Sequence, residues 1–231
     1  RPFLGPSHRL LSLLKNDISA HEFSEVEDYI KNNDIADTNV IQLGLADSNY
    51  LENNNEFEKN FIYLKKFNSC YRKLLDYSFE IYVEKFFKIK KIYNSIKNKK
   101  LNLSKNATNY SPIFILGLPR SGTSLVEQIL SSDKKISPCG ELVYLDKKMQ
   151  ECMQKMNEKL NNLNVLEGVP DVYIEAIKNN LNIESSFITD KMPLNFFYIG
   201  IIKKIFPKSK IILCKRNKMD NIYSLFRNFF P

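Results

Sequence analysis

Histidine and tryptophan are nearly missing from this sequence, which holds two histidines and no tryptophan among its 231 residues. Both histidines, His8 and His21, lie near the N-terminus, which argues against a histidine-based zinc site or a serine–histidine pair elsewhere. The four cysteines follow no CxxC or other metal-type spacing. No stretch approaches the roughly 18 apolar residues of a membrane span, and no secretory signal pattern is visible. We therefore expect a cytoplasmic protein with no membrane span and no bound metal.

The charge balance is basic, with a net charge of +8 and a pI near 9.1. Hydrophobic residues make up 43% of the chain, a share that can fill a sizeable core and argues against global disorder. A basic surface suits an anionic ligand such as a nucleotide. Because the lysines are scattered among asparagines and form no aromatic-plus-basic RNA-binding motif, we expect no nucleic-acid partner.

The first hundred residues have helical periodicity, with helices expected at about 7–16, 22–32, 38–53, 55–75 and 77–97. The pair 38–53 and 55–75 loosely resembles a tetratricopeptide hairpin, with Gly44 or Ala46 as the small residue. An unrelated helical hairpin fits the same pattern. We expect residues 1–100 to form a tetratricopeptide-like helical region that could bind a protein partner, followed by a polar linker at 101–111.

Residues 112–231 show an alternation of strands and helices instead. Strands are expected at 113–116, 135–138, 186–189 and 210–214, with helices at 123–132, within 141–182, at 194–205 and at 218–228. Such alternation implies right-handed crossovers and a parallel sheet. The predicted fold class is therefore α/β, with a phosphate-loop-like parallel sheet flanked by helices and preceded by the helical N-terminal region.

A glycine-containing loop follows the first expected strand, where residues 113–125 read IFILGLPRSGTSL. A strand, a tight loop and a helix start together present backbone N–H groups and a helix dipole to an anion. The spacing approaches the phosphate-loop pattern G-x-x-x-x-G-K-[ST], but Thr123 stands where the lysine belongs and Arg120 lies inside the loop. The loop is therefore suited to bind an anion and poorly suited to ATP hydrolysis. The alternative is an ordinary strand–loop–helix junction.

Polar residues also follow the other three expected strands: Gly140 and Glu141, then Asp190 and Lys191, then Arg216. Ligands of open α/β sheets bind beyond the carboxyl ends of the strands, so these groups should meet at one edge. The cations suit a doubly anionic ligand. Glu141 is a candidate general base or, alternatively, an acid at a helix start. Asp190 is expected to be the structural partner of a nearby base.

Four segments of the sequence resemble the sulfotransferases that use 3′-phosphoadenosine 5′-phosphosulfate. They are PIFILGLPRSGTSLVEQIL (112–130), PCGEL (138–142), ITDKMPLNFFYIG (188–200) and FPKSKIILCKRNKMDNIYSLF (206–226). The resemblance is closest to the tyrosylprotein sulfotransferase-like group and its bacterial relatives with tetratricopeptide repeats. It implies sulfuryl transfer from this donor, without a metal, to a hydroxyl-bearing acceptor such as a protein tyrosine, a carbohydrate or a small molecule.

The resemblance also implies roles for individual residues. The 5′-phosphosulfate loop falls on Arg120, Ser121, Gly122, Thr123, Ser124 and Leu125, and the 3′-phosphate pair falls on Arg216 and Ser224. The base of tyrosylprotein sulfotransferases falls on Glu141, and the lysine that stabilises the transferring group falls on Lys191. Sulfuryl transfer, like phosphoryl transfer, depends mostly on positioning and on stabilising negative charge, which these residue types can supply.

The sequence departs from the family pattern in two places. Arg216 is followed by Asn217 and Lys218, where the family has aspartate and glycine, and the family's C-terminal strand has no counterpart before Pro231. The chain also begins with arginine rather than methionine. We expect a fragment at both ends, which by itself would bind the donor poorly or fold incompletely.

Two other functions fit parts of the sequence. The first is a phosphate-loop kinase, against which the missing loop lysine and the lack of metal-binding acids argue. The second is a tetratricopeptide-type binding module joined to an inactive sulfotransferase domain. In that case the helical N-terminal region would be the functional part.

Overall fold

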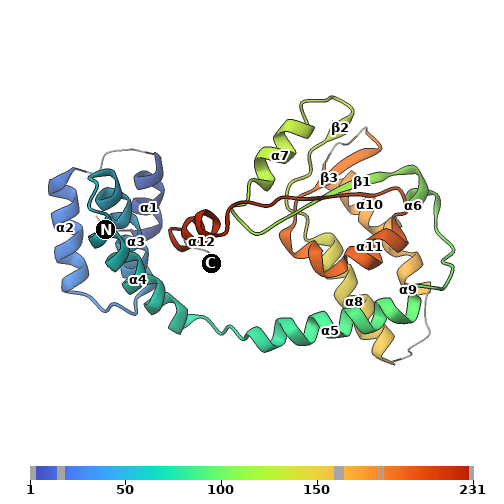
Figure 1. Ribbon diagram of the computed structural model, residues 1–231, viewed down its shortest axis with the longest axis horizontal. Coiled ribbons are helices and arrows are strands. Elements are labelled where there is room, and N and C mark those ends of the chain that lie inside the picture. Colours follow the sequence, from blue (N-terminus) through green and yellow to red (C-terminus); the bar gives the residue numbers. More distant parts are fainter. Residues whose placement is uncertain (1–3, 15–18, 159–163, 182, 184, 229–231) are drawn as a thin grey trace. The chain divides into compact units, whose positions relative to one another are not determined.

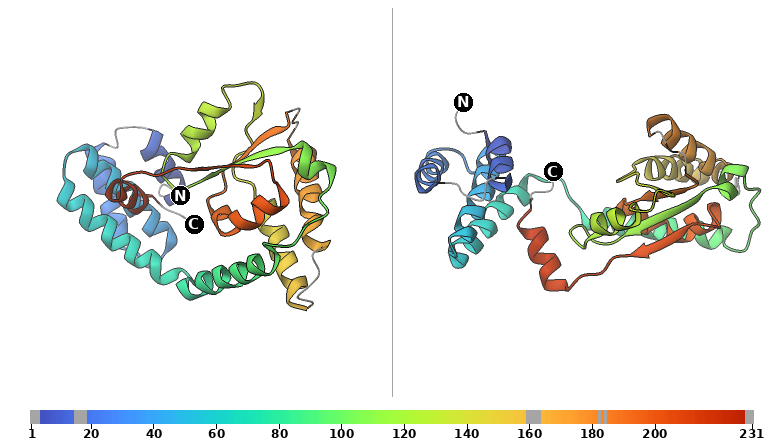
Figure 2. Two further views of the ribbon diagram at one scale, coloured as in Figure 1. Left: turned by 45° about the vertical axis from the view of Figure 1, so that its right-hand side comes forward. Right: turned by 90° about the horizontal axis from the view of Figure 1, so that it is seen from above.

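The computed structural model describes residues 4–14, 19–158, 164–181, 183 and 185–228. Contacts divide the chain into two compact units, one of Arg1–Tyr77 with Lys218–Pro231 and the other of Ser78–Asn217. Among the described residues, the first unit is built of helices and the second contains a sheet with helices around it (Figures 1 and 2). The expected α/β class with a helical N-terminal region is thereby confirmed.

The first unit is a helical bundle, and two of its described helices begin at recognisable capping residues. It contains α1 (Gly5–Leu14), α2 (Ala20–Lys31), α3 (Thr38–Asn53), α4 (Phe57–Leu74) and α12 (Lys218–Phe226). Ser19 and Glu22 form a reciprocal capping box at the start of α2, and the Asp37 side chain accepts from the Asn39 N–H at the start of α3. Helix α3 contacts α1, α2 and α4, so it is the central helix of this unit.

The apolar face of α3 packs closely on α4. Leu43 and Ile41 are fully buried together with Leu64 and Phe67 of α4. Gly44 lies against the Phe67 ring so closely that an added Cβ atom would overlap it. The small residue expected at Gly44 is therefore required by the approach of the two helices.

Helix α12, which is far along the chain, completes this bundle. The Asn68 side chain on α4 donates to the Phe226 carbonyl at 2.8 Å, and the Phe61 and Phe226 rings lie 5.7 Å apart. Arg227 forms an ion pair with Glu52 at 2.6 Å. The C-terminal helix is thus held by apolar and polar contacts to helices from the first third of the sequence.

The second unit is built around a sheet in the order β2-β3-β1-β4, whose described strands all pair in parallel. The strands are β1 (Ser111–Leu116), β2 (Ile136–Ser137), β3 (Phe187–Asp190) and β4 (Lys210–Leu213). Phe114 of β1 pairs with Asp190, the last residue of β3, and Leu116 pairs with Leu213, the last residue of β4. The carboxyl ends of these strands therefore meet at one edge, as the sequence predicts.

The two faces of the sheet are covered by different elements. Phe114, Leu116 and Ile188 belong to a core with α8 (Tyr144–Glu158), α10 (Val169–Asn180), 3₁₀ helix η1 (Pro193–Tyr198) and α11 (Ile199–Ile205), which gather on one side in Figure 1. Thr189 alternates with Ile188 and thus faces the other side. There it meets Glu127 of α7 (Thr123–Leu130). A short helix, α9 (Asn164–Glu167), joins α8 to α10.

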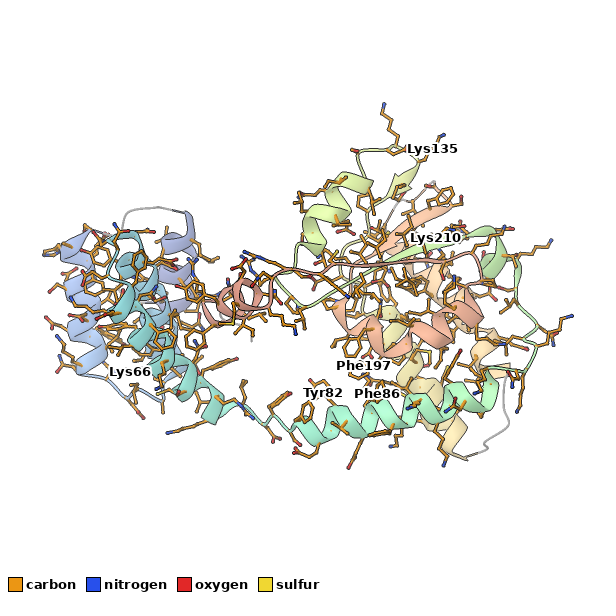
Figure 3. All side chains as sticks on the ribbon, viewed as in Figure 1. Lys66, Tyr82, Phe86, Lys135, Phe197 and Lys210 are labelled. Atoms are coloured by element: carbon orange, nitrogen blue, oxygen red, sulfur yellow. The ribbon has the colours of Figure 1, made fainter. Side chains whose placement is uncertain are left out.

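Helices α5 (Phe79–Ile96) and α6 (Lys105–Asn109) also belong to the second unit. Ile89, Ile92 and Ile96 of α5 are buried in the sheet-side core, and Tyr82 stacks on Phe197 with ring centres 6.4 Å apart (Figure 3). In the segment expected to be a linker, the Asn106 side chain donates to Asp171 at 2.8 Å and Ala107 is buried. The apolar stripe of α5 therefore packs on the α/β core. The sequence alone places this helix in the N-terminal region, because it follows the other helices there. No helix in the described part of the chain is both long and apolar enough to cross a bilayer.

We predict that Gly44→Ala destabilises the helical unit. Its Cβ atom would meet the buried Phe67 ring, and such overpacking costs about 1–3 kcal/mol, against about 1 kcal/mol gained from the helix propensity of alanine. The free energy of unfolding from urea titrations should fall by up to about 2 kcal/mol, with faster amide exchange in α3 and α4. Gly168→Ala adds a Cβ atom where no described atom lies within 4 Å and should not reproduce the loss. Equal effects of the two variants would contradict the packing argument.

Candidate active site at the carboxyl edge of the sheet

The loop of residues 117–122 joins β1 to α7 and has an unusual backbone. Arg120 has φ 68° and Gly122 has φ 95°, both in the left-handed region. Gly117 lies so close to the end of β4 that an added Cβ atom would be 2.8 Å from the Cys214 carbonyl oxygen. The loop is therefore compact, and its path depends on glycine at 117 for space and at 122 for conformation.

This loop presents unsatisfied polar groups. Helix α7 begins after Gly122, which has no side chain that could cap the helix. The first backbone N–H groups of α7 therefore face the loop without a side-chain acceptor. The Ser121 hydroxyl is buried and finds no hydrogen-bond partner among the described residues. A buried hydroxyl next to a helix N-terminus fits an anionic ligand that accepts from both. Thr123 is buried, whereas Arg120, Ser124 and Leu125 are exposed.

Arg216 lies beside this loop. It follows β4, and its Nη1 atom donates to the Arg120 carbonyl oxygen at 3.4 Å. The structure thus brings together Arg216 and the anion-binding loop, two of the predicted parts of the site. Ser224, the predicted partner of Arg216, lies in α12 of the first unit, and its pairing with Arg216 stays a prediction.

Glu141 and Lys191 come together at the ends of β2 and β3. The Lys191 Nζ atom donates to Glu141 Oε1 at 2.9 Å, with the lysine side chain 12% exposed and the glutamate side chain 57% exposed. Helix α8 begins at Tyr144, so Glu141 lies outside its first turn and faces Lys191 instead. The predicted base and the predicted cation are therefore direct neighbours.

Asp190 is a buried carboxyl group that faces away from this pair. Its Oδ2 atom accepts from the Tyr173 hydroxyl at 2.8 Å, and its Oδ1 atom accepts from the Met192 N–H at 3.0 Å. Burial raises the pKa of Asp190 to about 6, although the hydrogen bonds oppose the shift. The expected partner of Asp190 was a base, and this prediction is wrong: a tyrosine hydroxyl and a backbone amide satisfy it.

Two residues near the edge of the sheet escaped the sequence analysis. Glu127 of α7 is 8% exposed and its Oε1 atom accepts from the Gly140 N–H at 3.0 Å and the Thr189 hydroxyl at 2.5 Å. The Thr189 oxygen accepts in turn from the Cys139 N–H at 3.2 Å. An acid inside the mostly apolar helical run LVEQIL was the available signal for Glu127. Nothing in the sequence marks Thr189 as its partner.

Thiol chemistry is disfavoured at Cys139, which lies between β2 and Glu141. Burial raises the pKa of the Cys139 thiol to about 11, so the reactive thiolate is scarce near neutral pH. Within the described ranges, no group of three or more His, Cys, Asp or Glu side chains is arranged to hold a metal ion.

Comparisons with known proteins identify the family. A sequence model described as the sulfotransferase family matches residues 112–231, more than half of the chain. The chain belongs to the sulfotransferase family. The matched residues include the loop after β1, Glu141, Lys191 and Arg216, so this edge of the sheet lies within the sulfotransferase part of the chain.

Two related proteins match different fractions of this chain. A protein of Aquifex aeolicus (strain VF5) with no assigned activity in its name is 30% identical over 199 residues, which are 78% of this chain and 25% of the relative. A Caenorhabditis briggsae protein named "Putative protein-tyrosine sulfotransferase" is 24% identical over 123 residues, 52% of this chain and 44% of the relative. The chain thus spans less than half the length of either relative.

We predict that Asp190→Asn removes a pH-dependent loss of stability. The pKa of Asp190 in the folded protein, about 6, exceeds that of an unfolded aspartate, about 3.9. The folded state therefore binds more protons between these values, and stability falls as the pH rises from about 4 to 6, by about 3 kcal/mol. Urea titrations from pH 4 to 7 should show this decline in the wild type and its absence in the variant. The asparagine amide can still accept from Met192 and donate to Tyr173. Parallel pH profiles would contradict the assignment.

Proposed function

We propose that this sulfotransferase moves a sulfuryl group from 3′-phosphoadenosine 5′-phosphosulfate to a hydroxyl acceptor, with protein tyrosine as the first acceptor to test. The observation that carries the proposal is the direct pairing of Glu141 with Lys191 at 2.9 Å, at the sheet edge that also holds the anion-binding loop. A carboxylate that can take a proton and an ammonium that can stabilise negative charge are the two groups that the reaction requires.

The loop supports the donor part of the proposal. The N–H groups at the start of α7 and the unpartnered Ser121 hydroxyl suit the oxygens of a 5′-phosphosulfate. Arg216, which touches the loop through the Arg120 carbonyl, is the cation proposed to bind the 3′-phosphate, together with Ser224. Thr123 occupies the position of the phosphate-loop lysine, so Lys191 is the proposed source of positive charge near the transferring group.

The proposed reaction is a direct in-line displacement. The acceptor hydroxyl loses its proton to Glu141 while its oxygen attacks the sulfur atom. The bond between sulfur and the bridging phosphate oxygen breaks, and the electron pair stays on that oxygen. The products are a sulfate ester and adenosine 3′,5′-bisphosphate. Lys191 stabilises the charge that develops on the bridging oxygen, and the N–H groups of the loop stabilise the phosphate.

The acceptor, the location and the partner are the less constrained parts of the proposal. One relative has protein-tyrosine sulfotransferase in its name, which makes a tyrosine hydroxyl the first choice over a carbohydrate or a small alcohol. We propose a cytoplasmic protein whose helical N-terminal unit, tetratricopeptide-like in its α3–α4 hairpin, binds a protein partner. Incubation with radiolabelled donor and a tyrosine peptide, an oligosaccharide or a phenol tests the acceptor class directly. Sulfated product from none of them would contradict the proposed activity.

We predict that Arg216→Ala weakens the binding of adenosine 3′,5′-bisphosphate selectively. Loss of a charge-assisted hydrogen bond costs about 1.5–3 kcal/mol, a factor of about 10–100 in Kd. Binding of 5′-AMP, which lacks the 3′-phosphate, should change little. Lys215→Ala removes an equal charge from the adjacent exposed position and serves as the matched control. Calorimetry without Mg²⁺ measures the six dissociation constants, those of the wild type and the two variants for each nucleotide. Equal losses for both nucleotides, or tight binding of Mg-ATP instead, would refute the assignment.

We predict that Glu141→Gln impairs chemistry while leaving donor binding nearly intact. A positioned general base contributes about a hundred- to ten-thousand-fold to the rate, so kcat should fall by that factor with little change in the Kd of adenosine 3′,5′-bisphosphate. Lys191→Ala should also lower kcat, because it removes the charge that stabilises the leaving oxygen. Near wild-type turnover of Glu141→Gln would place the base elsewhere.

A further inference from the structure

Glu127 is a buried carboxylate to which the proposed reaction gives no part. It lies on α7, in the turn of helix that follows Thr123, and only 8% of the residue is exposed. Burying a carboxylate is unfavourable unless hydrogen bonds satisfy it. The bonds that satisfy Glu127 reach two other elements of the α/β unit, so they indicate what the side chain holds in place.

Those bonds converge on the turn of residues 139–141. Glu127 Oε1 accepts from the Gly140 N–H at 3.0 Å and from the Thr189 hydroxyl at 2.5 Å. Since the Thr189 oxygen accepts from the Cys139 N–H at 3.2 Å, two consecutive amides of the turn are bound, one directly and one through Thr189. The residue after them is Glu141.

The same turn is held from its other side. The Gly140 carbonyl accepts from the Lys191 N–H at 2.8 Å, and Gly140 has φ 66°, a conformation that glycine adopts without strain. The backbone that carries Glu141 is thus fixed through both polar groups of Gly140. The Glu141 side chain itself is 57% exposed and bonded to Lys191. The backbone, more than the side chain's packing, therefore determines where the carboxylate lies.

We propose that Glu127 is a positioning residue that places the Glu141 carboxylate for proton transfer, acting through the Gly140 amide and Thr189. The proposal rests on the proposed function, because it assumes that Glu141 is the base. Proton transfer requires hydrogen-bonding distance to the acceptor hydroxyl. A displacement of about 1 Å can cost about a hundredfold in rate. Glu127 joins the helix that begins at the anion-binding loop to the turn that carries the base, and so fixes their separation.

A double-mutant cycle tests the coupling, with the full chain, the phosphosulfate donor and a tyrosine peptide. Glu127→Ala should lower kcat by about a hundredfold and leave the Kd of adenosine 3′,5′-bisphosphate unchanged. In a Glu141→Gln background the same change should cost almost nothing further, because the group that it positions is already gone. Glu127→Gln keeps the accepting oxygen and should recover most of the loss. Gln128→Ala, at the adjacent exposed position, is the matched control.

A second measurement needs no turnover. Cys139 lies in the turn and is half-buried, whereas Cys152 is fully buried in α8. In Glu127→Ala, iodoacetamide should label Cys139 faster than in the wild type, with Cys152 labelling unchanged. Peptide mapping by mass spectrometry separates the two sites. Faster labelling of both cysteines would show loss of the fold and overturn the proposal.

The outcomes separate this inference from the proposed function. Independent losses for Glu127→Ala and Glu141→Gln, or unchanged Cys139 labelling, would overturn the positioning role while leaving sulfuryl transfer in place. Selective release of Cys139 in Glu127→Ala, together with no sulfated product from the wild type, would instead reject the proposed function. That result would still support Glu127 as the residue that holds the turn.

Discussion

Parallel pairing of β1 with both β3 and β4 is the constraint on which the site depends. The pairs Phe114–Asp190 and Leu116–Leu213 place the last residues of the three strands at one edge. The residues that follow the strands then lie at the same edge, which explains why a loop, a lysine and an arginine from distant parts of the sequence are found there. The buried side chains of Phe114 and Leu116 anchor the central strand on one face. The loops at this edge can therefore contain polar groups and left-handed backbone conformations while the core of the unit stays packed.

The Glu141–Lys191 ion pair joins the two side chains, but its free energy is small enough for a bound ligand to replace it. With the carboxylate 57% exposed, an ion pair of this kind contributes about 1 kcal/mol or less. A doubly anionic donor offers Lys191 a larger attraction, and in the proposed reaction it would draw the lysine toward the bridging oxygen. Glu141 would then lose its positive neighbour. In the proposed reaction the same contact would thus hold Glu141 before the donor arrives and release it afterwards.

The sequence predicted the sheet and its edge because strand–helix alternation and strand-end polar residues are local patterns. The positions of Arg216 and Lys191 followed from that alone. Glu127 did not, because a single acid in a short helix has the pattern of a surface residue, and its burial depends on the Thr189 hydroxyl from β3. Helix α5 was grouped with its neighbours in sequence, since periodicity reveals an apolar stripe but not which core it covers. Both features depend on contacts between segments that are distant in the sequence, and local patterns do not reveal such contacts.

Helix α12 shows why the family match and the folding units have different boundaries. The match runs through residue 231, yet α12 packs in the first unit, where Phe226 meets Phe61 and Arg227 pairs with Glu52. Because α12 directly follows Arg216 and Asn217, the segment that carries the proposed 3′-phosphate cation leads without a spacer into a helix anchored on α4. The family-matched segment therefore includes a helix that packs with helices outside the match, which is why the two boundaries differ.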